Sequence, residues 1–342
     1  MRVLIVGEMS GAGTALARGF ADNGCIVNHI GFANVFRNIY PEINLSEHHG
    51  VQGVIDRWLK INGTFFKEKI DLVVFIRYWR FARFDYLNEY MFTRLRERSR
   101  AMFFWSLSCD KVVRDTFKIA SPLCKPCLTS DSRSSCKYEE FASVKKESMF
   151  KSYIDIIVTG SIEYKEAYDA AGVKNVFIPM GIHIEKSDEL KVKFSKGLMT
   201  LYHSLSNVGY KGSDLFLKAS SNEFIEKNYQ LRIEEKVPLE EHLYHIDNSD
   251  VVFDQLYNRS LGMNGLQVLK RGRVLLCGRL NDYYGDFILP GIISPNVEGI
   301  VASLSEVHLN RKYYTEAVFH NFEVLKDRYS SAKLARDFLS LI

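Results

Sequence analysis

The sequence predicts an α/β protein made of two doubly wound domains. Short, almost entirely apolar segments of strand length alternate with amphipathic segments through both halves of the chain, as in parallel sheets covered by helices. The charged stretch Lys186–Lys196 interrupts this alternation, which restarts at Leu198. A length of 342 residues also exceeds what one hydrophobic core comfortably supports.

The first half of the chain contains six predicted strands. They are Arg2–Val6, Cys25–His29, Leu72–Ile76, Met102–Trp105, Asp155–Val158 and Asn175–Ile178. Between the first two strands, the segment Gly13–Gly24 has Leu16 and Phe20 at helical spacing, and Gly24 suits a helix C-terminus. Ser161 suits the N-cap of a helix that runs to Gly172.

The second half repeats the pattern. Its predicted strands are Leu198–His203, Leu231–Ile233, Val251–Phe253 and Val274–Cys277, and its predicted helices are Ser213–Ser221, Glu240–Asp247 and Gly262–Arg271. Lys186–Lys196 shows no clear buried face and is expected to be a linker. We therefore expect domains at residues 1–183 and 197–311, followed by a mostly helical segment at 312–342 that packs back on the first domain.

Composition excludes several classes of protein. The formal charge of +4 comes from 45 basic and 41 acidic residues, which is too small and dispersed an excess to favour nucleic acid as a partner. The apolar segments fall far below the ~18 residues that span a bilayer, and the first is too short for a signal peptide. Six cysteines without the density of a disulfide scaffold fit a reducing compartment. We expect a cytoplasmic protein.

The most informative stretch runs from Tyr202 to Asp214, with the sequence YHSLSNVGYKGSD. It reads as a strand end, a polar turn with two glycines, and a helix start. Backbone N–H groups at a helix start favour an anion, and Lys211 adds a positive charge beside them. These features suit a diphosphate. A capped helix with a solvated lysine would have the same pattern.

This stretch resembles the H-x-P-S-N-R-x-x-K-G-T-D segment of GT-B glycosyltransferases, and three others agree with that family in order and spacing. They are Ile154–Gly172, Asn175–Ile182 and Ser249–Gly278. The resemblance implies a GT-B fold, with two Rossmann-like domains, a cleft between them and a C-terminal helix that crosses back. It also implies transfer of a sugar from a nucleotide-sugar donor, with retention of configuration, to a glycan or lipid-linked glycan in bacterial surface polysaccharide assembly.

By position, the resemblance implies eight donor-binding residues: Asn207, Lys211, Gly212, Asp254, Gln255, Gly262, Asn264 and Gln267. Lys211 would hold the diphosphate. Gly262 and Asn264 would bring the backbone of a helix start to the phosphates and sugar, and Gln267 would face the ribose. No cofactor is implied beyond the donor itself, and enzymes of this kind generally need no bound metal.

The sequence also departs from the family pattern. Arg259 and Gln267 stand where retaining members have a pair of glutamates, and Val208 stands where an arginine is usual. A glutamine amide offers one acceptor, whereas a carboxylate can accept from two ribose hydroxyls. Two other functions therefore remain open: a catalytically inert GT-B-like partner subunit, and a nucleotide-sugar epimerase of the same fold.

The first domain is expected to face the acceptor. Its turn Gly7–Gly13 has the G-x-G of a dinucleotide fingerprint, but Leu16 replaces the third glycine, so we expect Gly11 and Gly13 to lie on the acceptor side. The stretch Arg77–Phe84 interleaves arginines with aromatic residues. Arg77 and Trp79 could meet an anionic membrane or a lipid-linked acceptor; the alternative is a helix with a solvated basic face.

Other polar residues of the first domain give weaker signals. Cys124 and Cys127 form a single CxxC without a second well-spaced pair, so no metal site is expected. Glu47, His48, His49 and Asp110 fall in expected loops and are interpreted as ordinary surface residues, with a catalytic or acceptor-binding role as the alternative.

Overall fold

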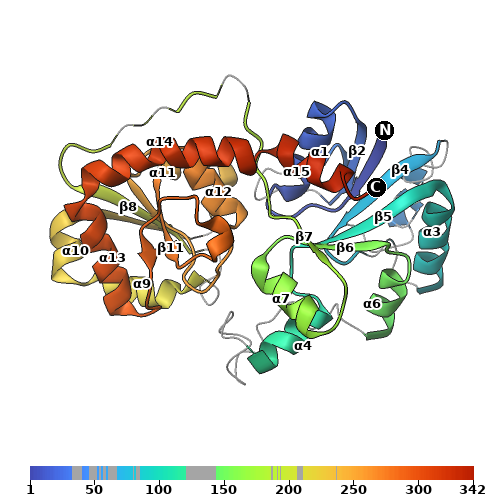
Figure 1. Cartoon of the computed structure of the whole chain (residues 1–342), viewed down its shortest axis with the longest axis horizontal. Helices are drawn as coiled ribbons and strands as arrows, with labels where there is room; N and C mark the ends of the chain where they lie inside the picture. The colour runs from blue at the N-terminus through green and yellow to red at the C-terminus, as the bar shows by residue number, and fades with distance from the viewer. Residues whose placement is uncertain are drawn as a thin grey trace. The chain divides into compact units, whose positions relative to one another are not determined.

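The computed structural model describes residues 1–32, 41–45, 52–53, 55–56, 59–60, 68–79, 81, 85–120, 144–185, 188–190, 192, 194–205, 211–235 and 237–342. These residues form two compact units, each with its own parallel sheet (Figure 1). Unit 1 comprises the described residues of Met1–Ile119, Cys136–His183 and Ser331–Ile342, and unit 2 those of Ala120–Ser135 and Ile184–Ser330. The predicted α/β class with two Rossmann-like units is confirmed.

Unit 1 contains a seven-stranded parallel sheet. In spatial order its strands are β3 (Ile43–Asn44), β2 (Ile26–Gly31), β1 (Arg2–Val6), β4 (Ile70–Ile76), β5 (Ser99–Ser106), β6 (Ile156–Thr159) and β7 (Val176–Phe177). The central strands β4 and β5 are almost fully buried, which explains their unbroken apolar sequences. Strand order reverses between β1 and β4, so the carboxyl ends of these two strands border the place where ligands enter such sheets.

The helices of unit 1 are α1 (Ala12–Asp22), α3 (Asp85–Arg98), α4 (Lys111–Ala120), α6 (Val144–Lys151), α7 (Ile162–Ala170) and α15 (Ser331–Leu339). The predicted helix boundaries are confirmed at two sites. Gly24 follows α1 with φ of +77°, and the Ser161 hydroxyl accepts a hydrogen bond from the Tyr164 amide at the start of α7. A left-handed glycine and a serine N-cap are strong local signals.

The C-terminal segment divides between the units. Helix α14 (Arg311–Arg328) lies in unit 2, whereas Ser331–Ile342 belongs to unit 1, where α15 packs on α1. Gly19 of α1 makes this approach possible, because a Cβ there would lie only 1.9 Å from the Ser331 carbonyl oxygen. The Ser331 amide donates to the Ile182 carbonyl, which joins the two chain segments where they enter unit 1.

Unit 2 contains a five-stranded parallel sheet. In spatial order its strands are β12 (Gly291–Ile292), β11 (Val274–Gly278), β10 (Val251–Phe253), β8 (Met199–Ser204) and β9 (Tyr229–Glu234). The remaining elements are α9 (Ser213–Ser220), α10 (Glu223–Asn228), α11 (Leu239–Asp247), α12 (Met263–Lys270), the short η3 (Asp282–Tyr284) and α13 (Val297–Leu309). Strand order reverses between β8 and β10, which are direct neighbours.

The expectation that Lys186–Lys196 has no buried face is wrong. Leu190, Val192 and Phe194 pack against the hydrophobic core of unit 2. Their alternate spacing places three apolar side chains on one face of an extended segment, although charged residues stand between them. Gly272 lies beneath this segment, where a Cβ would come within 2.7 Å of the Leu190 side chain.

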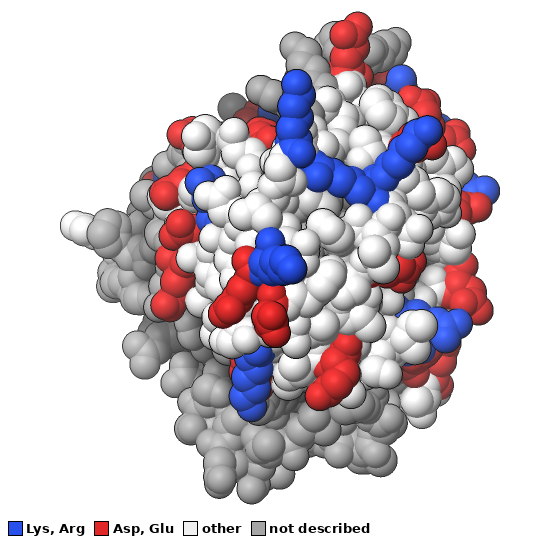
Figure 2. Space-filling model, turned by 90° about the vertical axis from the view of Figure 1, so that its left-hand side faces the viewer, with Lys and Arg blue, Asp and Glu red and all other residues white. Residues whose placement is uncertain are grey.

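Charged side chains of both signs are mixed on one face of the molecule. Figure 2 shows the face seen from the left of Figure 1, where α10 and α13 lie, with acidic and basic residues scattered over mostly uncharged surface.

Candidate functional site

The candidate site lies in unit 2, where the strand order reverses. In sheets of this type, ligands bind outside the carboxyl ends of the strands on either side of the reversal. Lys211 follows β8, and Asp254 is the first residue after β10. Lys211 and Asp254, from two predicted donor segments, therefore lie beyond the carboxyl ends of two neighbouring strands.

Lys211, Asp254 and Asn264 form one polar cluster. The Lys211 ammonium lies 3.1 Å from the Asp254 carboxylate, and the Asn264 side-chain amide donates to the same carboxylate oxygen at 2.8 Å. Asp254 is 2% exposed and Lys211 8% exposed, so the ion pair is largely shielded from water. The alternative of a solvated lysine is therefore wrong, because Lys211 is buried and paired with Asp254.

The backbone of Leu256 holds the three segments of the site together. Its amide donates to the Lys211 carbonyl at 3.0 Å. Gly212 has φ of +72°, and a Cβ there would lie 2.8 Å from the Leu256 Cβ. Gly278, at the end of β11, approaches Leu256 from another side, where a Cβ would lie 2.0 Å from its carbonyl oxygen. Both glycines are required for this close packing.

The start of α12 offers backbone amides to an anion. Gly262 is its N-cap and supplies no side chain to bond them, and the first turn contains no acidic residue. Such a helix start carries partial positive charge and suits a phosphate. A Cβ at Gly265, in the first turn, would lie 3.6 Å from the second Asp254 carboxylate oxygen, so the Lys211–Asp254 pair stands directly beside this helix start.

The other predicted donor residues have different surroundings. The Gln255 side-chain amide donates to the Ser260 carbonyl at 2.8 Å, which fixes the buried loop before Gly262. Gln267 Oε1 accepts from Arg271 at 2.8 Å, which leaves one lone pair of that oxygen and the amide N–H groups for a ribose contact. Asn207 lies outside the described residues.

His203 stabilises the structure beneath the cluster in its neutral form. Its Nδ1 donates to the Phe253 carbonyl at 3.0 Å, and its Nε2 accepts from the Ser213 hydroxyl at 2.8 Å. Burial, followed by the positive charge of Lys211, lowers the pKa of His203 to about 4. An acceptor role for Nε2 is possible only when the ring is uncharged.

This lowered pKa predicts a loss of stability in mild acid. As pH falls below the ordinary value of 6.5, the unfolded chain binds a proton at His203 while the folded protein does not until about pH 4. The stabilisation is therefore complete above pH 6.5 and falls by about 2 kcal/mol by pH 5. Urea unfolding of the parent and of His203→Asn at both pH values tests this, because the variant should show a smaller difference. Equal pH dependence in the two proteins would contradict it.

In unit 1, the glycine turn after β1 is already occupied by a carboxylate. Glu8 accepts from the amide of Gly11 at 2.7 Å and from the amide and hydroxyl of Thr14 at 2.9 Å each. Its side chain is 4% exposed. A dinucleotide pyrophosphate would need these same amides, so the turn is poorly suited to a phosphate. A Cβ at Gly13 would lie 2.8 Å from the Gly7 carbonyl, which accounts for that glycine by packing.

Arg77 and Trp79 lie at the carboxyl end of β4, on the other side of the strand-order reversal of unit 1. Arg77 is half-buried and has φ of +63°, a left-handed conformation that an arginine rarely adopts. Its amide donates to the Trp105 carbonyl at 3.0 Å. Trp79 is buried and stacks on Phe32, with ring centroids 5.2 Å apart. The strained Arg77 is a candidate for function, whereas Trp79 is a core residue.

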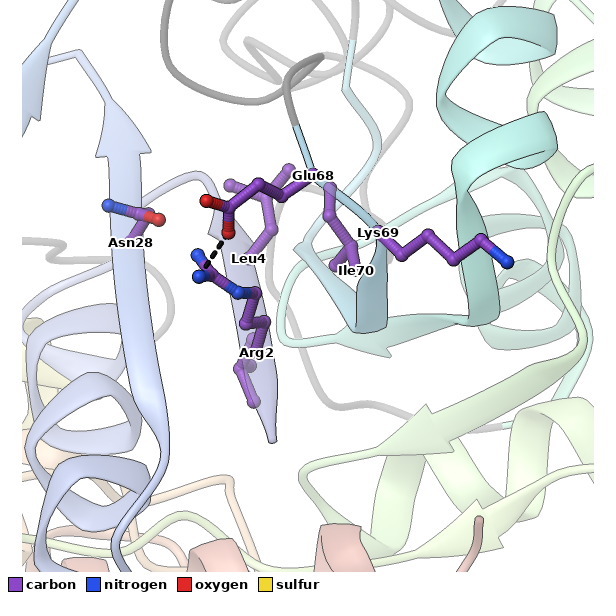
Figure 3. Close-up of a pocket in the computed structure, with 7 residues that line it drawn as sticks. Arg2, Leu4, Asn28, Glu68, Lys69 and Ile70 are labelled. Carbon is purple, nitrogen blue, oxygen red and sulfur yellow. Dashed lines mark ion pairs between the residues drawn. The ribbon is translucent and has the colours of Figure 1, made fainter.

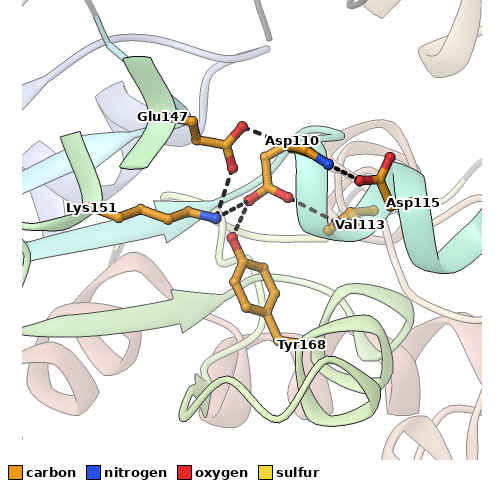
Figure 4. A network of polar contacts seen from close by, with 7 residues as sticks. Asp110, Val113, Asp115, Glu147, Lys151 and Tyr168 are labelled. Atoms are coloured by element: carbon orange, nitrogen blue, oxygen red, sulfur yellow. Dashed lines mark hydrogen bonds and ion pairs between the residues drawn. The ribbon is translucent and has the colours of Figure 1, made fainter. Parts of the chain in front are cut away.

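The interpretation of Asp110 as an ordinary surface residue is wrong. Figure 4 shows it at the centre of a buried network. Asp110 accepts from the Val113 amide at 3.0 Å and caps α4, and it also accepts from the Tyr168 hydroxyl. Lys151 lies 3.6 Å from Asp110 and 2.7 Å from Glu147. Burial raises the pKa of both Asp110 and Tyr168. The network anchors α4, α6 and α7 to the end of β5.

A small pocket in unit 1 lies at the wrong end of the sheet for a ligand site. It is lined at the amino-terminal ends of β1 and β4 by Arg2, Val3, Leu4, Asn28, Glu68, Lys69 and Ile70 (Figure 3). Arg2 forms an ion pair with Glu68 across it. Ligands of doubly wound sheets bind beyond the carboxyl ends, on the opposite edge.

The predictions of a membrane surface and of a metal site receive no direct support. Three arginines that follow the Arg77–Phe84 stretch have partners within unit 1: Arg94 pairs with Glu97, Arg96 pairs with Asp155, and Arg100 donates to the Ile342 carbonyl. Within the described ranges, no helix is long and apolar enough to cross a membrane, and no three potential metal ligands gather. Arg80, Arg83, Cys124 and Cys127 lie outside the described ranges, as do the expected surface residues Glu47, His48 and His49.

Comparison with known proteins establishes the fold. No family model and no curated protein matches the chain. The sucrose-phosphate synthase of Thermosynechococcus elongatus has 10% identity and a TM-score of 0.59, over 100% of this chain and 98% of that chain. An alpha-glucosyltransferase in complex with UDP and a 13-mer DNA has 11% identity and a TM-score of 0.65, over 100% and 98%. HepE of Anabaena in complex with UDP and glucose has 10% identity and a TM-score of 0.58, over 100% and 99%. These structures are GT-B glycosyltransferases, and the chain has their fold.

Proposed function

We propose that this protein is a glycosyltransferase that takes a sugar from a nucleotide donor, with unit 2 holding the donor and unit 1 facing the acceptor. The observation that carries the proposal is the Lys211–Asp254–Asn264 cluster beside the start of α12, at the strand-order reversal of unit 2. A cation and helix amides at this place suit a diphosphate. The full-length similarity to UDP-bound glycosyltransferases supports the same function.

In the proposed reaction the diphosphate is the leaving group. Negative charge grows on it as the bond to the sugar breaks, and the Lys211 ammonium with the amides at the α12 start would stabilise that charge. Asp254 would hold Lys211 in place, since its carboxylate is buried and already faces the ammonium. Retention of configuration is the proposed outcome, on the sequence resemblance alone.

The proposed acceptor is a glycan or lipid-linked glycan of a surface polysaccharide. Phosphate is poorly accommodated at the α1 start, because the Glu8 carboxylate occupies its amides. Arg77, in its left-handed conformation, would contact the acceptor. We further propose that no cofactor beyond the donor is needed, and that the enzyme works in the cytoplasm beside the membrane.

The proposal is tested by calorimetry with UDP, and by incubating the protein with UDP-sugars and analysing the products. We expect micromolar to millimolar binding of UDP, a range typical of enzyme substrates, and slow release of free sugar by transfer to water. An altered sugar still attached to UDP would indicate the epimerase instead. Binding without any change in the sugar would indicate an inert subunit, and absence of nucleotide binding would contradict all three.

A further inference from the structure

We infer that His242 is a positioning residue for the donor diphosphate site, a role that rests on the proposed function above. His242 belongs to α11, which no part of the sequence pattern connects with phosphate binding. The structure places its half-buried ring between the strand β8 and the start of α12. Its two ring nitrogens bond to side chains from these two different elements.

An unbroken chain of polar contacts runs from β8 to the site. The Tyr202 hydroxyl lies 2.8 Å from His242 Nδ1, and His242 Nε2 lies 2.6 Å from Asn264 Oδ1. Asn264 Nδ2 lies 2.8 Å from Asp254 Oδ1, and that oxygen lies 3.1 Å from Lys211 Nζ. His242 is thus two side chains away from the proposed phosphate-binding ammonium.

The direction of each hydrogen bond follows from the carboxylate. An ionised Asp254 can only accept, so Asn264 must donate to it through Nδ2 and keep Oδ1 as an acceptor. His242 Nε2 must then carry a proton and donate to Oδ1, and with the ring neutral Nδ1 accepts from Tyr202. The imidazole therefore fixes which way the Asn264 amide points.

This orientation matters for the charge balance of the site. Asp254 lies close to the start of α12, and an unbalanced carboxylate there would repel a phosphate. The Asn264 N–H group and the Lys211 ammonium share its charge. Without the His242 donor, the Asn264 amide is free to turn away. Asp254 would then hold Lys211 more tightly, and the ammonium would be less available to the donor.

Two conservative variants distinguish the roles of the two ring nitrogens of His242. A glutamine amide can reach the position of Nε2, so His242→Gln keeps a donor for Asn264. An asparagine amide reaches only the position of Nδ1, so His242→Asn keeps a partner for Tyr202 and loses Asn264. We expect His242→Asn to weaken UDP binding in calorimetry by about three- to tenfold, the size of one hydrogen bond, and His242→Gln to restore most of that loss.

His245→Asn is the matched control. It changes the same residue type one turn later on α11, where the ring contacts Arg232, Glu241 and the face of Tyr202 but makes no described hydrogen bond to Asn264. It should leave UDP affinity unchanged. In a Lys211→Ala background, His242→Asn should weaken UDP binding much less than it does in the parent, because His242 acts through the Lys211 ammonium.

Several results would overturn the inference. Equal UDP affinity in the parent and His242→Asn, or restoration by asparagine rather than glutamine, would remove Asn264 from the argument. Equal weakening in all three histidine variants, together with lower thermal stability, would mean a general packing role. A parent that binds no UDP would overturn the proposed function and this role together. If UDP binding of the parent is weakened by Lys211→Ala but not by His242→Asn, this role of His242 is overturned and the proposed function is not.

Discussion

Replacing Lys211 with alanine is expected to weaken binding of UDP about ten- to a hundredfold, since hydrogen bonds to charged groups contribute about 1.5–3 kcal/mol. The structure indicates a second cause of weaker UDP binding, besides the loss of the ammonium itself. Asp254, 2% exposed, would keep only the described Asn264 donor and would place a poorly balanced carboxylate beside the phosphates. Calorimetry with UDP measures the effect. Lys218→Ala, on the exposed side of α9, removes the same charge and should not change the affinity.

Loss of Lys211 should also lower stability, because breaking a buried ion pair leaves a charge uncompensated. The double variant Lys211→Ala/Asp254→Asn separates the two effects. Neutralising Asp254 should recover part of the free energy of unfolding and only part of the UDP affinity, because the carboxylate no longer repels the phosphates but the ammonium is still missing. Full recovery of affinity in the double variant would mean that Asp254 repels the nucleotide and that Lys211 does not hold it. Unchanged affinity in folded Lys211→Ala would place the donor elsewhere.

Most of the sheet framework could be predicted because buried parallel strands are apolar throughout. Strands such as Leu72–Ile76 and Val251–Phe253 have no polar interruption, and the structure has strands at both places. Strands β3, β7 and β12 have only two residues each, and of these only β7 lies in a predicted strand, Asn175–Ile178. The buried side of Lys186–Lys196 was missed because its charged residues conceal an alternation of three apolar ones.

The site could be predicted at the level of segments. Carboxyl ends of neighbouring strands meet at one edge, so the segments of Lys211, Asp254 and Gly262 could be expected to converge. Which side chains touch depends on the rotation of each helix about its axis. No pattern in the sequence therefore predicts that Lys211 is buried against Asp254, or that His242 of α11 contacts Asn264.

Two carboxylates of unit 1 illustrate the same limit. Glu8 and Asp110 each follow a strand and bond to the amides of the next helix, a role that acidic residues before a helix often have. The local signal for Asp110 was present in its position before an amphipathic segment. The contacts with Tyr168 and Lys151 come from distant helices, and no local pattern predicts them.

Gly278→Ala is expected to be the most destabilising single change of the site, at about 3 kcal/mol or more, because overpacking against backbone has little means of relief. The new Cβ would lie 2.0 Å from the Leu256 carbonyl oxygen and 2.8 Å from its carbonyl carbon. The Gly278 amide also donates to the Gln255 carbonyl at 2.8 Å, so strand and loop cannot separate without losing that bond. Urea unfolding measures the loss.

Gly197→Ala is the control, since a Cβ at Gly197 meets nothing within 4 Å, and its stability should change by less than about 0.5 kcal/mol. If Gly278→Ala folds under stabilising conditions, it should also bind UDP more weakly than the parent. The reason is that Leu256, displaced by the new methyl group, is the residue whose amide holds the Lys211 carbonyl. If Gly278→Ala has the stability of the parent, the packing of Gly278 against Leu256 does not hold the site together. If it loses stability but keeps its UDP affinity, this packing stabilises unit 2 without positioning Lys211.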